Sequence, residues 1–121
     1  MITNWWDLLS SDVRDDLFSE IPGGFQGWAT EHAGVVETAL MMHFRPDLVR
    51  DDCIVDDGPD RTSPYVFKPP RDKQISASGT YYKATHATPE MGERVAADVL
   101  DILVEGISHE WGDVIQDSSL S

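Results

Sequence analysis

Two residues that can exchange protons with a ligand, Glu31 and His32, are neighbours in the sequence. A histidine takes up and releases a proton near neutral pH, and a carboxylate beside it can share or orient that proton. Two tryptophans, Trp6 and Trp28, would offer flat apolar faces to a small planar ligand if the segments that carry them converge. Together these residues suit the transfer of a proton to the leaving group of a small, flat substrate.

The same residues also allow a structural interpretation, in which Glu31 and His32 are only a helix cap and a core histidine. A metal site is not indicated by their spacing. A zinc-protease helix needs two histidines at i and i+4, whereas His43 comes 11 residues after His32, which is about 16 Å along a helix. The sequence also lacks a phosphate-binding loop, a dinucleotide fingerprint and a nucleophile elbow. We therefore assign no metal ligands.

Glu31 and His32 lie in the segment GWATEHAGVVETALMMHF, from Gly27 to Phe44, and this segment must position them. From about residue 32 to 44 it is apolar nearly all round, which predicts a buried helix. Gly34 would cost that helix about 1 kcal/mol relative to alanine, and a buried carboxylate must find a partner or take up a proton. In a regular helix His32 and Glu37 would point about 140° apart. Glu37 is therefore expected to be a buried structural partner for a cation or a backbone donor.

The segments before this helix predict a strand, a helix and a loop. Residues 2–6 (ITNWW) are β-branched and aromatic, which favours a strand, and Ser10 or Ser11 can cap a helix that follows. Residues 22–27 (PGGFQG) break that helix. They form either a simple turn or a mobile lid that delivers Phe25 and Trp28 to a cleft.

The segments after it predict one more strand and a long helix. Residues 53–57 (CIVDD) favour a short strand, and Thr88 can cap a helix that begins at Pro89. The apolar stripe of that helix comprises Met91, Val95, Val99, Ile102, Leu103 and Ile107. Residues 113–121 are expected to fray. Strands between helices predict α/β layering, with the apolar middle helix against a sheet.

Composition limits the possible partners. The chain has 121 residues, of which 40% are hydrophobic, enough for one domain with a real core. It carries 22 acidic and 9 basic residues, a net charge of −13. Such a surface repels phosphate backbones and anionic membranes, so we expect neither nucleic acid nor membrane as a partner. An acidic, lysine-poor composition favours a halophilic source; an acidic protein of ordinary origin is the alternative.

The cysteine count and the hydrophobic pattern predict the compartment. Cys53 is the single cysteine, so no intrachain disulfide is possible. The first residues lack the basic and apolar regions of a signal peptide, and no run approaches the ~18 apolar residues of a membrane span. A soluble, cytoplasmic protein is expected.

Three blocks resemble the C-terminal half of the creatininase (creatinine amidohydrolase) family. They are NWWDLL from Asn4, GGFQGWATEHAGVVETALMMHFRPDLV from Gly23, and ATPEMGERV from Ala87, and they cover most of residues 3–107. The resemblance implies an α/β fold, the three-layer α/β/α creatininase-like architecture, of which residues 1–121 would be the C-terminal half. It also implies a homo-oligomer, usually a hexamer, that hydrolyses creatinine or a related cyclic amide with a pair of divalent metal ions such as Mn or Zn.

The resemblance assigns roles to the residues introduced above. Trp6 and Trp28 match the two tryptophans that enclose the substrate, His32 matches the histidine that handles the proton during ring opening, and Glu31 matches the acidic residue beside it. Ala29 stands where the family has an aspartate that contacts the substrate, so a different amide is an alternative to creatinine.

The metal ligands of the family lie in its N-terminal half, and nothing in this chain matches them. By this resemblance the chain is expected to be a hydrolase acting on C–N bonds of cyclic amides, yet inactive without a complementing N-terminal half. Two alternatives remain. The first is an inactive fragment that binds a small molecule or mediates oligomerisation. The second is a plain structural domain.

Overall fold

The computed structural model describes residues 2–58 and 76–118, with side chains up to residue 112. These residues form four α-helices: α1 (Trp5–Leu8), α2 (Ser11–Ser19), α3 (Val35–Phe44) and α4 (Pro89–Ser118). Short 3-10 turns connect them: η1 (Trp28–Thr30), η2 (Pro46–Leu48), η3 (Asp51–Cys53) and η5 (Ala84–His86). None of the helices in these ranges is long and apolar enough to cross a membrane.

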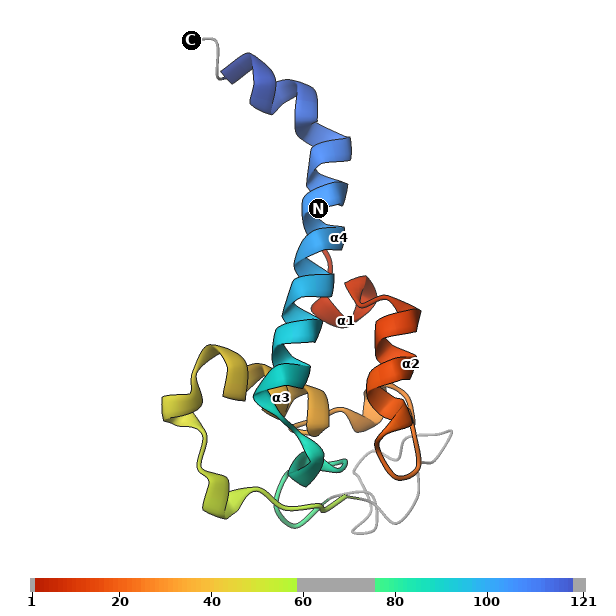
Figure 1. Cartoon of the computed structure of the whole chain (residues 1–121), viewed down its shortest axis with the longest axis vertical. Coiled ribbons are helices and arrows are strands. Elements are labelled where there is room, and N and C mark those ends of the chain that lie inside the picture. Colours follow the sequence, from red (N-terminus) through yellow and green to blue (C-terminus); the bar gives the residue numbers. More distant parts are fainter. Residues whose placement is uncertain (1, 59–75, 119–121) are drawn as a thin grey trace, which may run out of the picture.

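Helix α4 is the longest helix of the described residues, and the other three α-helices all contact it. Its N-terminal half packs against α1, α2 and α3, and its C-terminal half extends past them (Figure 1). The predicted start is confirmed, because the Thr88 hydroxyl oxygen accepts a hydrogen bond from the Met91 N–H at 3.2 Å and the helix begins at Pro89. The helix continues to Ser118, so residues 113–118, which were expected to fray, are helical; residues 119–121 lie outside the described part.

The core lies where α2, α3 and the first turns of α4 meet. Its members are apolar and at least nine-tenths buried: Leu9, Leu17, Phe18, Ile21, Val35, Val36, Ala39, Ala87 and Val95. From the stripe predicted on α4, Val95 is 1% exposed, and Met91 and Val99 pack against the core from its edge. Burial of each valine, leucine, isoleucine or phenylalanine in this cluster contributes about 1.5–3 kcal/mol, so the cluster determines how the helices pack.

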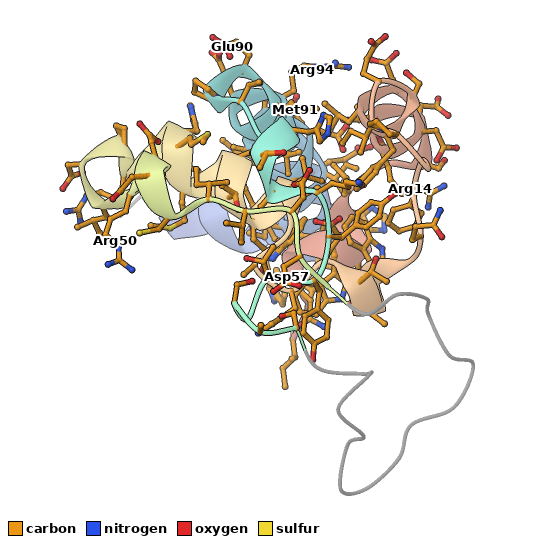
Figure 2. All side chains as sticks on the ribbon, turned by 90° about the horizontal axis from the view of Figure 1, so that it is seen from below. Arg14, Arg50, Asp57, Glu90, Met91 and Arg94 are labelled. Atoms are coloured by element: carbon orange, nitrogen blue, oxygen red, sulfur yellow. The ribbon has the colours of Figure 1, made fainter. Side chains whose placement is uncertain are left out.

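Polar contacts tie α2 to α4. Ser10 is the N-cap of α2, as predicted, and its hydroxyl oxygen accepts a hydrogen bond from the Val13 N–H at 3.4 Å. The Asp98 carboxylate on α4 accepts hydrogen bonds from both the Ser10 N–H at 2.8 Å and the Ser10 hydroxyl at 2.9 Å. Arg94 projects from α4 on the side of α2 (Figure 2) and pairs with Asp16 at 2.6 Å. These contacts fix the position of α2 against α4.

The strand predictions are wrong for the described residues. Helix α1 occupies Trp5–Leu8, where residues 2–6 predicted a strand, and η3 ends at Cys53, where a second strand was expected to begin. Residues 2–58 and 76–118 contain no strand, so they do not display the α/β layering. Short runs of aromatic and β-branched residues do not distinguish a strand from a helix that packs its aromatic rings on neighbours. Here the tryptophans of α1 find aromatic partners, as described below.

Gly92 sets how closely α3 and α4 approach. A Cβ atom at this position would overlap the Ala39 carbonyl of α3 and would lie 2.9 Å from the His43 Cβ. Gly106, on the same helix, has no heavy atom within 4 Å of such a Cβ. The two glycines therefore differ in surroundings, although both are helical.

We expect Gly92→Ala to lower the free energy of unfolding by about 1–3 kcal/mol, because two helix backbones must separate to admit the methyl group. Gly106→Ala is the matched control and should raise stability by about 1 kcal/mol through helix propensity alone. Urea unfolding followed by circular dichroism measures both. Equal stability of the two variants would contradict the close contact between α3 and α4.

Candidate functional site

A cavity of about 420 Å³ and a second of about 320 Å³ lie on the two sides of Glu37. The 320 Å³ cavity, which we call the indole pocket, brings together all four residues that the sequence singled out. Its lining residues are Trp5, Trp6, Trp28, Ala29, Glu31, His32 and Glu37. Its volume lies within the range of small-molecule sites in proteins. The pocket combines apolar walls with two carboxylates and one imidazole.

Edge-to-face aromatic contacts build the wall of the indole pocket. Trp5 lies 5.6 Å from Trp6 and 5.4 Å from Trp28, measured between ring centroids. Trp28 contacts Phe25 at 4.9 Å, and Phe25 contacts Phe18 of the core at 5.0 Å. This aromatic row joins α1, the glycine loop and α2, and each such pair contributes about 0.5–1.5 kcal/mol beyond area burial. The condition set for a shared site is met, because Trp6 and Trp28 line the same pocket.

The glycine loop of residues 22–27 is held at both ends. The Tyr82 hydroxyl donates to the Gly24 carbonyl at 2.9 Å and lies 3.1 Å from the Pro22 carbonyl oxygen. Phe25 anchors the loop through its contact with Phe18. These contacts favour the turn interpretation of this loop over a mobile lid.

Glu31 is buried at the back of the pocket and caps α3. Glu31 is 5% exposed, and its Oε2 accepts a hydrogen bond from the Val36 N–H at 3.1 Å. The start of a helix leaves N–H donors without partners and favours negative charge, so a carboxylate is well placed there. Gly34 is the N-cap residue and lies before the helix rather than inside it. A Cβ on Gly34 would come within 2.9 Å of Glu31 Oε2, so the glycine makes room for the carboxylate.

Burial raises the pKa of Glu31 to about 7. The largest cause is the loss of water around the carboxylate; the Val36 N–H opposes the rise, and repulsion from Glu37 adds to it. The second carboxylate oxygen, Oε1, is buried without a hydrogen-bond partner among the described residues. A carboxyl group that titrates near neutral pH can hold or release a proton under ordinary conditions.

His32 is exposed at the rim of the same pocket. Its carbonyl oxygen accepts a hydrogen bond from the Tyr81 N–H at 2.9 Å, and its ring meets the Tyr81 ring edge-to-face at 5.4 Å. The next residue, Ala33, has a φ of 48°, in the left-handed region that residues other than glycine rarely adopt. The backbone therefore turns sharply between His32 and α3.

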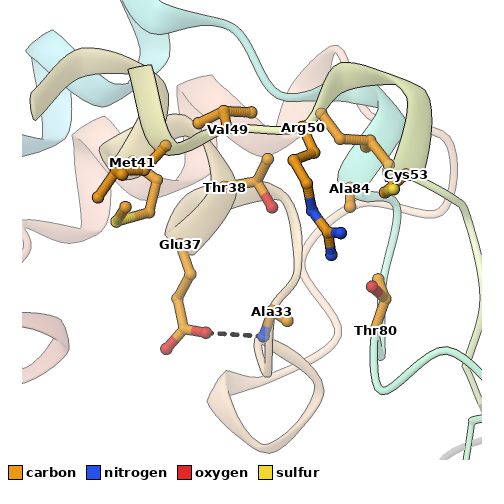
Figure 3. Close-up of a pocket in the computed structure, with 11 residues that line it drawn as sticks. Ala33, Glu37, Thr38, Met41, Val49, Arg50, Cys53, Thr80 and Ala84 are labelled. Carbon is orange, nitrogen blue, oxygen red and sulfur yellow. Dashed lines mark hydrogen bonds between the residues drawn. The ribbon is translucent and has the colours of Figure 1, made fainter. Parts of the chain in front are cut away.

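The predicted separation of His32 and Glu37 is wrong, because α3 begins at Val35 and not at His32. The turn at Ala33 brings both side chains to the same pocket. The expectation that Glu37 partners a backbone donor is confirmed: its Oε2 accepts from the Ala33 N–H at 2.7 Å (Figure 3). Glu37 is half-buried rather than buried.

Sequence reasoning missed Trp5 and Tyr81. Trp5 lines the pocket beside Trp6, and the doubled tryptophan was the available signal. Tyr81 supports His32 from a segment about 50 residues away in the chain, and no local pattern could have indicated this contact. The larger cavity also went unnoticed; Arg50 and Thr80 border it together with Glu37 (Figure 3).

The described residues do not suit a pair of metal ions. Within residues 2–58 and 76–118, no group of three or more His, Cys, Asp or Glu side chains is placed to hold one. In the indole pocket Glu31 uses one oxygen to cap α3 and Glu37 uses one to hold Ala33. The indole pocket itself holds two carboxylates and one imidazole beside an aromatic wall.

Comparison with known proteins identifies the class of protein. Residues 6–107 match the model of the creatininase family, described as creatinine amidohydrolase. The chain belongs to this family.

Particular relatives agree with this assignment. The chain is 37% identical over 109 residues to the creatinine amidohydrolase of Pseudomonas putida, covering 89% of this chain and 39% of that protein. A solved manganese form of creatininase superposes with a TM-score of 0.77 at 34% identity, over 91% of this chain and 42% of that one. A creatininase variant in complex with creatine gives a TM-score of 0.75 at 34% identity, over 89% and 42% of the two chains. The chain thus spans about two fifths of the length of these relatives.

Proposed function

We propose that residues 1–121 form the C-terminal part of a metal-dependent amidohydrolase that opens creatinine or a related cyclic amide. The observation that supports this best is the indole pocket, in which Trp6, Trp28, Glu31 and His32 meet. The solved relatives named above include a creatine complex and a manganese form. Family membership makes the same reaction class the natural assignment, and the pocket supplies groups suited to it.

Each residue has a role that follows from its surroundings. The indoles of Trp6 and Trp28 enclose a flat ring and exclude water from it. His32, exposed at the rim, exchanges a proton with the amide nitrogen that leaves on ring opening. Glu31 lies behind it as a buried carboxyl group that holds the start of α3 and titrates near neutral pH. Glu37 stiffens the turn through Ala33 and adds negative charge to the pocket.

Ala29 bears on the choice of substrate. It lines the pocket and is exposed, so a ligand can reach it. A methyl group cannot accept a hydrogen bond, and a substrate donor that faces it would lose a partner. We therefore propose a cyclic amide that presents an apolar edge or a smaller group at this position, with creatinine as the first compound to test.

The metal pair belongs, in this proposal, to the rest of the family domain. The described residues offer no cluster for it, and the chain covers 42% of the length of the solved manganese enzyme. The remainder would supply the metal ligands, the sheet of the α/β/α architecture and further subunit contacts. A cytoplasmic homo-oligomer is the form we propose for the complete assembly.

Reconstitution tests the proposal. The 121-residue chain is assayed with Mn or Zn, alone and mixed with the part of the Pseudomonas putida relative that lies outside the 109 matched residues; we call the mixture the reconstituted enzyme. We expect no amide hydrolysis from the chain alone and metal-dependent opening of creatinine or a related cyclic amide by the mixture. The isolated relative fragment is the control.

Two results would overturn the proposal in different ways. Hydrolysis by the isolated chain would show that it needs no further metal ligands. A mixture that forms a complex but hydrolyses no cyclic amide would reject the enzymatic role. Metal-free binding of creatinine by the chain, measured by titration calorimetry, would then favour a binding module built on the preformed indole pocket.

A further inference from the structure

Helix α4 carries a second apolar stripe that does not belong to the core. Leu100, Val104, Ile107 and Trp111 recur at intervals of four, three and four residues. At 100° per residue they fall within about 60° of one another, and about 150° away from the stripe of Met91, Val95 and Val99. We call these four residues the outer stripe. One helix thus presents two apolar faces on nearly opposite sides.

Three residues of the outer stripe are exposed, and Ile107, which the sequence placed on the stripe of Met91 and Val95, is half-buried. Leu100 is 56%, Val104 52% and Trp111 42% exposed, whereas Val95 on the core stripe is 1% exposed. Val104, Ile107 and Trp111 belong to the C-terminal half of α4, the half that extends beyond α1 and α2 (Figure 1). Single exposed apolar residues are ordinary. Three exposed residues and one half-buried residue in register over about 16 Å of helix form a seam of the kind that packs against another element.

The charges beside the stripe restrict what can cover it. Asp101 and Glu110 lie about 60° from the outer stripe, one on either side of it, and residues 98–112 contain no lysine or arginine. A second copy of this chain, paired through the same stripe, would bring two acidic helices together, and the net charge of −13 opposes self-association further. The rim therefore fits a partner whose apolar face is bordered by neutral or basic groups.

We infer that the outer stripe docks the remainder of the creatininase domain, whether that remainder continues this polypeptide or is a separate chain. The solved manganese creatininase shares this fold at a TM-score of 0.77, yet this chain covers 42% of its length. The part of that enzyme outside the match is the occupant that we propose for the stripe. The outer stripe offers this occupant an apolar seam on the described surface. The inference rests on the proposed function for the identity of the partner.

The test uses the full chain and the fragment of the Pseudomonas putida relative defined above. Leu100→Ser with Val104→Ser removes two stripe side chains that are exposed in the chain alone, so folding should be unaffected. Each loss of a buried aliphatic side chain weakens binding roughly tenfold, so we expect the double variant to bind about 100-fold more weakly. Glu105→Ser with His109→Ser is the matched control, with the same spacing on another face of α4, and should change affinity less than about threefold.

Sedimentation velocity reports the complex, and the hydrolysis assay reports function separately. A stripe variant that binds as tightly as the wild type, or a wild-type chain that forms no complex, overturns the inference. So does a wild-type dimer that the stripe substitutions dissociate, because the occupant would then be a second copy. A complex that needs the stripe but hydrolyses nothing supports the docking surface and rejects only the proposed function. If the stripe variant hydrolyses the amide as fast as the wild type, the proposed function is supported and the docking surface is rejected.

Discussion

Replacing His32 by alanine in the reconstituted enzyme is expected to lower kcat by about 10²–10⁴-fold, the usual contribution of a positioned general acid or base. The imidazole lines the indole pocket at its exposed rim, where it can reach a bound ligand. Its backbone is held by the Tyr81 N–H, so removing the side chain leaves the turn in place. KM should change little, because the tryptophans still enclose the ring.

The control is His109→Ala, an exposed histidine on α4 that does not line the pocket. Its kcat should stay within about twofold of the wild type, as expected for a surface change. Circular dichroism should show both variants folded to the same extent. A His32→Ala enzyme that keeps its kcat, while still binding its partner fragment, would remove His32 from the chemistry and leave it as a rim residue.

The second large effect concerns stability and needs only the chain itself. The pKa of Glu31 is raised from 4.5 to about 7 by burial. Between these values the folded chain keeps a proton that the unfolded chain has released, so raising the pH favours unfolding. Across this window the wild type should lose on the order of 3 kcal/mol relative to Glu31→Gln, which cannot ionise. The difference in the free energy of unfolding between the two proteins should grow from pH 4.5 upward and reach its full size above pH 7.

Urea unfolding at pH 4 and pH 8, in the same salt, measures this difference. Comparing each variant with the wild type at each pH cancels the titration of the other acidic residues. Glu105→Gln, an exposed carboxylate on α4, should shift stability by less than about 0.5 kcal/mol at both values. If Glu31→Gln follows the wild type in parallel from pH 4 to pH 8, the carboxyl group is not desolvated in solution.

The sequence predicted helix boundaries well wherever a side chain marks them. Ser10 caps α2 and Thr88 caps α4 because short hydroxyl side chains satisfy the free N–H groups of a first turn. The start of α3 carries no such residue at its N-cap, which is Gly34. Its capping carboxylate comes from Glu31, three residues earlier, so a local pattern placed the start too far toward the N-terminus.

The error in that boundary explains the error in the site. His32 and Glu37 were placed on a regular helix and therefore apart, whereas the left-handed backbone at Ala33 turns both toward one cavity. Backbone conformations of this kind depend on contacts that form only in the folded chain, here the Ala33 N–H to Glu37 bond. The membership of Trp6, Trp28, Glu31 and His32 in one site was predictable from residue types and the family resemblance. Their geometry was not.

The aromatic row gives the pocket a limited capacity to change. Consecutive ring contacts connect the wall of the pocket to Phe18 of the core, through Trp6, Trp5, Trp28 and Phe25. The wall and the core are therefore one packed unit. Widening the wall would require giving up contacts that hold α1, the glycine loop and α2 together. Divergence toward new ligands is therefore easier at rim positions outside the row, such as Ala29, or in the part of the domain beyond this chain. A change at Ala29 would alter what a ligand meets at the rim and leave the aromatic framework intact.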